Sequence, residues 1–333
     1  MCTDGAKAMT GATAGAIAKI KEKSNETTSS HSILHRHALA FKNIPPCLKN
    51  GVDETIKIVN FIKSRPLKFR LFKILCDDLG SIHSTLLFHT EIRWLSRGKV
   101  LTRLMELRAE VSSFLMDHNV TLVETMNDVI WLFQLLYLAD IFNKMNELSL
   151  SLQERTLTIF DVSSRVCALK RKIDYWSECI SKRELECFPI MQAFLEENKL
   201  QAPISIINEI SEHLKQLKNA FNKYCPTDRE VFLKDSEWVV NPFSVCGKPS
   251  ILSSIEYGSM IDITSDSTFQ STFSSNSYVE FWLNLKNTSF EHLSQKAITI
   301  LLPFALSETG FSTYTATKTK YRNRLNVEPD LRI

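Results

Sequence analysis

The spacing of apolar residues predicts helices along most of the chain. Apolar positions recur three and four residues apart in 5–23 and in 52–62, and prolines at 45, 46 and 66 stand where helices begin. The same spacing predicts long amphipathic helices farther along, at 100–116, 126–150, 159–195 with a break at Pro189, and 206–221. Glycine is absent from 99 to 246, which suits the packing of helix on helix.

Short segments near the start of the chain are predicted to be strands. Cys2-Thr3 leads into Asp4, 32–35 is apolar at its middle, and 85–94 has a β-like pattern. Near the other end, 225–277 is rich in proline, serine and threonine and is predicted to be a loop-rich connector. Two further helices are expected at 290–302 and 304–321.

The composition is that of an ordinary soluble globular protein, with 44% hydrophobic and 23% charged residues. A net charge of +3 is too small to indicate a nucleic-acid partner by itself. The longest apolar stretch, 129–142, is interrupted by Gln134 and Asp140 and is shorter than the roughly 20 residues that span a bilayer. It predicts a core helix, and we expect no membrane partner. No signal peptide is apparent at the N-terminus, so an intracellular protein is expected.

The cysteines do not have the spacing of a zinc site. None of the eight forms a C-x-x-C pair or a zinc-finger framework. We therefore expect free thiols that pack as small apolar groups.

Four short blocks, in order along the chain, resemble hAT-superfamily transposases. Residues 3–6 are similar to the segment that holds the second catalytic aspartate, and 32–36 to a C-x-x-H element. Residues 90–96 resemble a T-x-x-R-W-x-S element, and 307–312 with 320–325 resemble the C-terminal block. The blocks are most similar to those of vertebrate domesticated transposase-like proteins, whose relatives often carry a BED-type zinc finger upstream.

The resemblance implies an α-rich α/β fold, in which an incomplete RNase H-like core is interrupted by a long all-helical insertion. It divides the chain into a partial core at 1–97, a helical insertion with its connector at 98–285, and a C-terminal block at 286–333 that returns to the core and contributes to dimerisation. The strand that carries the first catalytic acid in the family would precede Met1, so we expect an N-terminally truncated chain.

The same resemblance implies an ancestral two-metal site. Three carboxylates would hold Mg²⁺ or Mn²⁺ ions, with Asp4 as the second acid and Glu308 as the third. Ser32 and Ser307 stand where relatives have cysteine. We therefore expect Asp4 and Glu308 to be vestigial, with weak metal binding at most, no cofactor and no enzymatic activity. Asp4 also fits a simple helix cap, and Glu308 a solvated acid.

DNA contacts are expected around Trp94, which in the family stacks on an extruded base. Beside it, Arg93, Arg97 and Lys99 would contact DNA phosphates, and His35 is expected nearby. Ordinary core packing also fits Trp94 and His35, and solvated helix faces fit the cations. A second basic stretch offers the same two readings, and its members are Lys63, Arg65, Lys68, Arg70 and Lys73.

These observations predict a transposase-derived, catalytically inactive nuclear protein that acts by binding DNA or protein, with a homodimer formed through the C-terminal block. One alternative is a residual metal-dependent transposase or nuclease, if an upstream strand supplies the missing aspartate. Another is a plain helical scaffold or a non-functional fragment, and a cytoplasmic location is the alternative to the nucleus.

Overall fold

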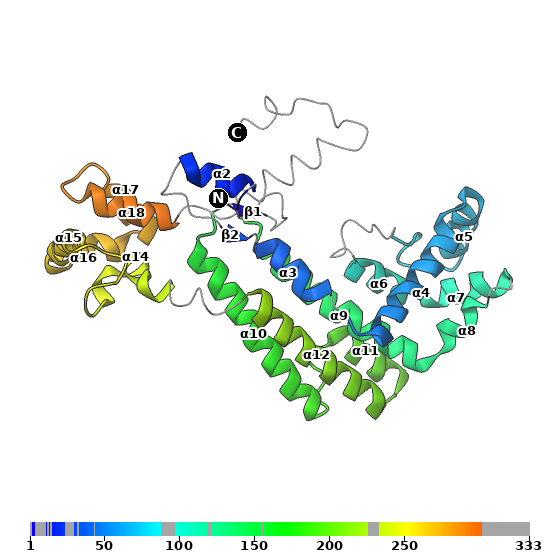
Figure 1. Cartoon of the computed structure of the whole chain (residues 1–333). Coiled ribbons are helices and arrows are strands. Elements are labelled where there is room, and N and C mark those ends of the chain that lie inside the picture. The colour runs from blue at the N-terminus through cyan, green and yellow to red at the C-terminus, as the bar shows by residue number, and fades with distance from the viewer. Residues whose placement is uncertain are drawn as a thin grey trace, which may run out of the picture. The chain divides into compact units, whose positions relative to one another are not determined.

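The chain is described by a computed structural model that divides it into two compact units (Figure 1). The structure describes residues 2–3, 11, 13, 15–23, 30–31, 33–42, 44–87, 97–118, 121–154, 156–225 and 233–301. The first unit comprises Met1–Arg36, Leu152–Cys167 and Asn222–Ile333, and the second comprises His37–Ser151 and Ala168–Phe221.

The second unit is a bundle of helices arranged around α9 (Val129–Ser151). Its other elements are α3 (Ile33–Lys42), α4 (Pro46–Lys63), α5 (Pro66–Asp78), α6 (Arg97–Glu106), α7 (Arg108–Asp117), α8 (Leu122–Asn127), α10 (Ile159–Ser181), α11 (Pro189–Asn198) and α12 (Ile204–Tyr224), of which α3, α10 and α12 extend into the first unit. Helices α4, α6, α8 and α11 all contact α9, which is buried on every side from Trp131 to Phe142. A helix that is apolar all round has to be covered in this way, and the predicted core helix at 129–142 is confirmed.

The predicted helix boundaries are confirmed at the prolines and are wrong at several breaks between them. Helices α4, α5 and α11 begin at Pro46, Pro66 and Pro189. The expected helix at 100–116 is divided at Leu107, and the one at 159–195 ends at Ser181, shortly before Arg183 adopts a positive φ of 61°. Neither Leu107 nor the segment around Arg183 contains a proline or glycine, so no local signal marks these breaks.

Helices α6 and α9 approach each other closely at a glycine. A Cβ atom placed on Gly98 would lie 3.0 Å from the Cβ atom of Phe142 and 3.2 Å from the backbone nitrogen of Asn143. Since neither atom sits at the end of a flexible side chain, the two helices would have to separate to make room. Gly98 therefore sets the spacing between α6 and the central helix.

The first unit contains the short strands β1 (Cys2–Thr3) and β2 (Ser30–His31), which pair in parallel with Cys2 opposite Ser30. Helix α2 (Ala16–Lys23) lies between them in sequence. This two-residue pair is the only sheet within the described ranges, and Thr85–Leu87 form no strand. The expected α/β fold with an RNase H-like core is therefore wrong for this structure, which is all-helical apart from that pair. The predicted strand at Cys2-Thr3 is confirmed as β1, whereas 33–35 belong to a helix, and 88–94 lie outside the described residues. Short apolar segments of this length do not distinguish a strand from a helix or a loop.

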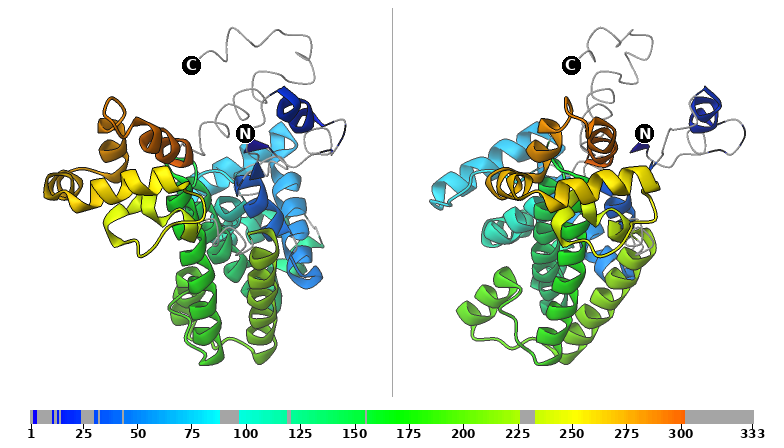
Figure 2. Two further views of the ribbon diagram at one scale, coloured as in Figure 1. Left: turned by 60° about the vertical axis from the view of Figure 1, so that its left-hand side comes forward. Right: turned by 90° about the vertical axis from the view of Figure 1, so that its left-hand side faces the viewer.

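The described residues 233–301 of the first unit are largely helical, although a loop-rich connector was expected over 225–277. The elements in this range are α14 (Glu237–Val240), the 3₁₀ turn η2 (Pro242–Ser244), α15 (Ser254–Ser265), α16 (Ser267–Ser275), α17 (Tyr278–Asn284) and α18 (Glu291–Leu301). Helices α15 to α18 gather together in both views of Figure 2. Ser253 with Glu256 and Ser277 with Glu280 form capping boxes at the starts of α15 and α17.

The serine and threonine hydroxyls of α16 find their hydrogen-bond partners within the helix. The hydroxyls of Thr272, Ser274 and Ser275 each donate to the carbonyl oxygen four residues earlier. The carboxylate of Asp266 caps the start of α16 by accepting from the N–H of Thr268 at 2.7 Å. This cap, with the packing of Phe269 and Phe273 against the buried core, favours the helix despite the low helix propensity that suggested a loop.

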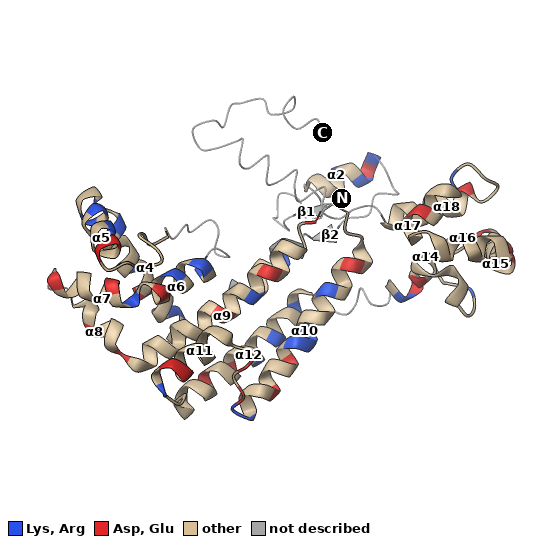
Figure 3. Ribbon diagram, turned by 180° about the vertical axis from the view of Figure 1, so that it is seen from behind, with Lys and Arg blue, Asp and Glu red and all other residues tan. Residues whose placement is uncertain are grey.

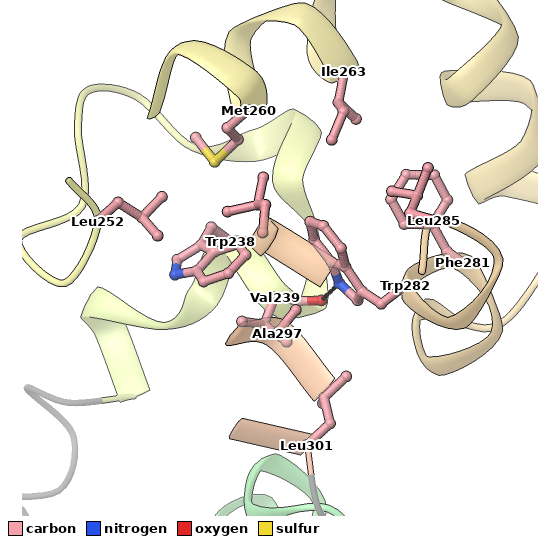
Figure 4. Close-up of a cluster of buried hydrophobic side chains, with 11 residues drawn as sticks. Trp238, Val239, Leu252, Met260, Ile263, Phe281, Trp282, Leu285, Ala297 and Leu301 are labelled. Carbon is pink, nitrogen blue, oxygen red and sulfur yellow. Dashed lines mark hydrogen bonds between the residues drawn. The ribbon is translucent and has the colours of Figure 1, made fainter. Parts of the chain in front are cut away.

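Two tryptophans form the centre of this helical group (Figure 4). Trp238 and Trp282 pack edge to face with ring centroids 5.3 Å apart, and both side chains are fully buried. The indole N–H of Trp282 donates to the carbonyl oxygen of Val239 at 2.7 Å, and the hydroxyl of Ser294 donates to the carbonyl oxygen of Trp282 at 2.5 Å. These bonds join α14, α17 and α18 around one core.

A buried ion pair adds α15 to the same group. Burial alone would raise the pKa of Glu256, but the Lys296 ammonium and the Ser253 N–H and hydroxyl stabilise its carboxylate and hold that pKa at about 2. The Lys296 ammonium lies 2.9 Å from the Glu256 carboxylate and also donates to the carbonyl oxygen of Ile251. Within the described ranges, no helix is long and apolar enough to cross a membrane.

The glycines of α6 and α15 give a matched test of this packing. Gly98→Ala should lower the free energy of unfolding by about 1–3 kcal/mol, because the added methyl group overpacks the contact with α9. Gly258→Ala should raise it by about 0.5–1 kcal/mol, because Gly258 is an exposed helical position with no atom within 4 Å of a new Cβ. Calorimetric unfolding of both variants measures the two effects. An unchanged stability for Gly98→Ala would contradict the close approach of α6 and α9.

Candidate interaction surface

Most of the predicted catalytic and DNA-contacting residues lie outside the described residues. These are Asp4, Glu308, Trp94 and Arg93, together with the C-terminal block at 302–333. His35 belongs to α3, and Arg97 and Lys99 belong to the first turn of α6. In the part of the chain that the structure describes, no group of three or more His, Cys, Asp or Glu side chains is placed to hold a metal ion.

The second basic stretch is described in full, and it covers the end of α4 and the first half of α5 (Figure 3). Two of its cations are engaged within the unit. The Lys63 ammonium donates to the carbonyl oxygen of Leu86 at 2.6 Å, and the Lys68 ammonium lies 3.1 Å above the centre of the Phe61 ring. Desolvation lowers the pKa of both lysines, and the nearby Arg65 guanidinium lowers that of Lys68 further.

Three cations of this stretch remain exposed. Arg65, Arg70 and Lys73 point away from the packed side of α5, and none of them forms an ion pair with a described side chain. No acidic residue occurs between Arg65 and Cys76. The first half of α5 therefore presents uncompensated positive charge to solvent.

Helix α5 is also apolar on two opposite sides. Phe72 and Cys76 are buried on the inner side, where the Phe72 ring meets the Phe114 ring of α7 edge to face at 5.5 Å. The outer face of α5, which we define as Leu67, Leu71 and Ile74, is exposed by 65%, 43% and 54%. These three residues are spaced four and three apart, so they form one apolar stripe along the helix.

The segment that follows α5 is fixed to the neighbouring helices. The Arg103 guanidinium of α6 donates to the carbonyl oxygen of Thr85 at 3.2 Å, and the Ser81 hydroxyl donates to the Glu110 carboxylate of α7. The His83 ring nitrogen lies 3.3 Å from the Glu106 carboxylate, which also pairs with Arg103. These contacts hold α5 in place from its C-terminal side, so its outer face is presented by a supported helix.

An open groove of about 540 Å³ lies elsewhere in the second unit, between α7, α8, α9 and α11. Met126, Leu132 and Phe194 supply much of its apolar lining, and the Arg108 guanidinium lies 5.1 Å above the Phe194 ring. Its size is within the range of small-molecule pockets. Nothing in its lining selects one ligand class, so it does not indicate an activity.

Two buried polar pairs in the second unit have structural roles. The Asp140 carboxylate of α9 accepts from the N–H groups of Ile190 and Met191 at 3.1 and 3.0 Å and so caps the start of α11. The Tyr137 hydroxyl lies 2.7 Å from Nδ1 of His213 on α12, and both side chains are buried. Asp140 appeared in the sequence only as an interruption of an apolar stretch.

The expectation of free thiols is confirmed at Cys47, Cys76, Cys167, Cys179, Cys187 and Cys246. Cys179 and Cys187 lie with their sulfur atoms 3.6 Å apart, near the end of α10 and before α11. Burial and the neighbouring Cys179 raise the pKa of Cys187 to about 11, so its thiol is a poor nucleophile at neutral pH. We therefore interpret Cys179 and Cys187 as packed structural residues and not as reactive thiols.

The outer face of α5 is the feature that sequence reasoning missed. The sequence placed its apolar residues in a helix that begins at Pro66, and its cations fitted either phosphate contacts or a solvated helix face. A helical wheel would have shown that apolar residues cover two opposite sides of α5, although it would not have shown which side is buried.

The comparison with known families agrees with a transposase origin. Residues 31–181, just under half of the chain, match the family model described as the FAM200/GTF2IRD2 helical domain. No solved structure matches the chain. The matched family is a domesticated, transposase-related one, so the match fits a transposase-derived protein, while the narrower assignment to hAT and BED-type relatives stays a prediction.

The buried titratable groups predict how stability depends on pH. Burial lowers the pKa values of His37 and His213 from 6.5 to about 4. Their contribution to the free energy of unfolding is therefore complete above about pH 6.5 and is lost as the pH falls toward 4. Burial raises the pKa of Asp140 to about 6, although its two N–H bonds and Lys144 oppose this. Its contribution therefore grows as the pH falls from about 6 toward 4 and offsets part of the loss.

We expect the free energy of unfolding to fall between pH 6.5 and 4, and to fall more steeply in Asp140→Asn, which cannot take up the compensating proton. Urea denaturation at a series of pH values measures both slopes. Asp53→Asn, at an exposed position of α4, is the control and should keep the wild-type slope. Equal slopes for wild type and Asp140→Asn would contradict the raised pKa.

Proposed function

We propose that this transposase-derived chain acts by binding another protein, and that the outer face of α5 is its main contact surface. The observation that carries the proposal is the exposure of Leu67, Leu71 and Ile74 as one stripe on a supported helix. Apolar stripes at this spacing are the usual means by which one helix recognises another. Contiguous exposed apolar surface on a folded domain commonly marks an interaction site.

A role without catalysis belongs to the same proposal. Its support is in the sequence, where Ser32 and Ser307 replace the cysteines of two blocks that accompany the ancestral acids. The expected nuclear location is likewise proposed, and it rests on the resemblance to transposases, which act on DNA.

Replacing the stripe by serine should remove partner binding and leave the fold intact. The variant Leu67→Ser/Leu71→Ser/Ile74→Ser changes only side chains that are at least 43% exposed, so we expect an unchanged circular dichroism spectrum. Proteins that co-purify with the wild-type chain from cells, an untagged second copy of the chain included, should be lost with this variant when compared by quantitative mass spectrometry. Ile255→Ser, which is 81% exposed on α15, is the matched control. Identical sets of proteins from wild type and the triple variant would contradict the proposal.

Binding to duplex DNA is the second candidate function. It is favoured by the exposed cations Arg65, Lys73 and Lys99, which form no ion pair with a described side chain. A phosphate contact needs only such positive charge and no sequence reading.

If DNA is bound, mobility shifts at graded salt should show an affinity that falls with a slope of about −0.9 for each phosphate contact. Arg65→Glu/Lys73→Glu should weaken the shift and reduce the slope by about 2, because two contacts are removed. Lys49→Glu, on the exposed side of α4, is the control for a charge reversal outside this stretch. The absence of any shift at low salt would reject this candidate.

A further inference from the structure

We propose that α5 binds α5 of a second copy of this chain, with the two helices antiparallel about a two-fold axis. The inference rests on the proposed function and names the partner of the same surface. It depends on the apolar stripe and on the distribution of charge along α5, which is basic in its first half and ends in Asp77 and Asp78.

The stripe has the spacing of a helix-pairing seam. Leu67, Leu71 and Ile74 are separated by four and then three residues, which corresponds to alternating core positions of a heptad. When two such helices run antiparallel, the core positions of one alternate with those of the other. Leu71 of one copy then meets Ile74 of the second copy, and the two-fold axis repeats this contact. The same residues of each copy thus form both halves of the interface, as a two-fold symmetric dimer requires.

The charges beside the stripe are complementary under the same axis. Arg70 and Asp77 are seven residues apart, so they lie on the same border of the outer face. Antiparallel pairing brings Arg70 of one copy beside Asp77 of the second copy, and Asp77 beside the other Arg70. Both residues are exposed, and neither forms an ion pair with a described side chain of its own unit.

This charge pattern favours a second copy over a purely acidic partner helix. An acidic helix would be attracted by Arg65, Arg70 and Lys73 but repelled by Asp77 and Asp78. A second α5 in the antiparallel orientation places Asp77 beside Arg70 twice, whereas Asp78 follows Ile74 by four residues and comes opposite Leu67 of the second copy. Antiparallel packing also sets the helix dipoles in a favourable relative direction.

The size of the surface predicts a weak, concentration-dependent dimer. Thirteen helical residues span about 20 Å. A single helix pair buries less than the roughly 1,200 Å² of a standard stable interface, so we expect a weak dimer that dissociates on dilution.

A charge-swap series on the full chain tests this pairing by sedimentation velocity over a range of concentrations. Arg70→Asp and Asp77→Arg should each raise the dissociation constant at least about tenfold, because like charges then face each other twice. The double variant Arg70→Asp/Asp77→Arg should recover wild-type dimerisation. An equimolar mixture of the two single variants should form a heterodimer, since positions 70 and 77 are then both acidic in one chain and both basic in the other.

Leu71→Glu should abolish the dimer, and Lys49→Glu should leave it unchanged. Circular dichroism and thermal unfolding verify that each variant is folded. A wild-type chain that stays monomeric at about 500 μM, or a dimer that none of the α5 variants weakens, would overturn the inference.

A partner other than a second copy would give a different set of effects in the charge-swap variants. If Asp77→Arg strengthens the capture of another protein while Arg70→Asp weakens it, and the double variant shows no recovery, the occupant is an acidic helix. That outcome would overturn the pairing of two copies and leave the proposed function standing. Unchanged capture by the serine triple variant would reject the proposed function itself.

Discussion

Burial of α9 is the constraint on which the second unit depends. Apart from Gln134 and Asp140, its side chains from Trp131 to Phe142 are apolar around the whole circumference, so every side of the helix has to be covered. Helices α4, α6, α8 and α11 supply that cover. The polar groups of α9 serve the same arrangement, because Asp140 caps α11 and Tyr137 bonds to His213 of α12.

The position of α5 follows from this arrangement. With α4 packed on α9, α5 packs mainly against α4 and α7, and Leu67, Leu71 and Ile74 on its other apolar side are exposed in the described structure. The contacts of Arg103 and Lys63 with the backbone that follows α5 keep the helix in this position. An apolar stripe that is costly to leave in water is thus retained on a supported element, as an interaction surface requires.

The sequence predicted where many of the helices begin, but it did not predict which of their faces are buried. Prolines at helix starts fix φ locally, so Pro46, Pro66 and Pro189 could be read directly. The core of Trp238 and Trp282 was missed, because the Asp266 cap of α16 and the capping boxes before α15 and α17 favour helices in a segment with loop-like composition. The outer face of α5 was missed because periodicity shows that a side is apolar but not whether anything covers it.

Hydrogen–deuterium exchange at low and high protein concentration tests the central claim most directly, because it reports the surface itself. If α5 is a self-complementary interface, exchange within 66–82 should slow as the concentration rises from about 1 to 200 μM, while exchange in α15 to α18 stays the same. Exchange in 66–82 that does not change with concentration, or protection confined to another helix, would contradict it.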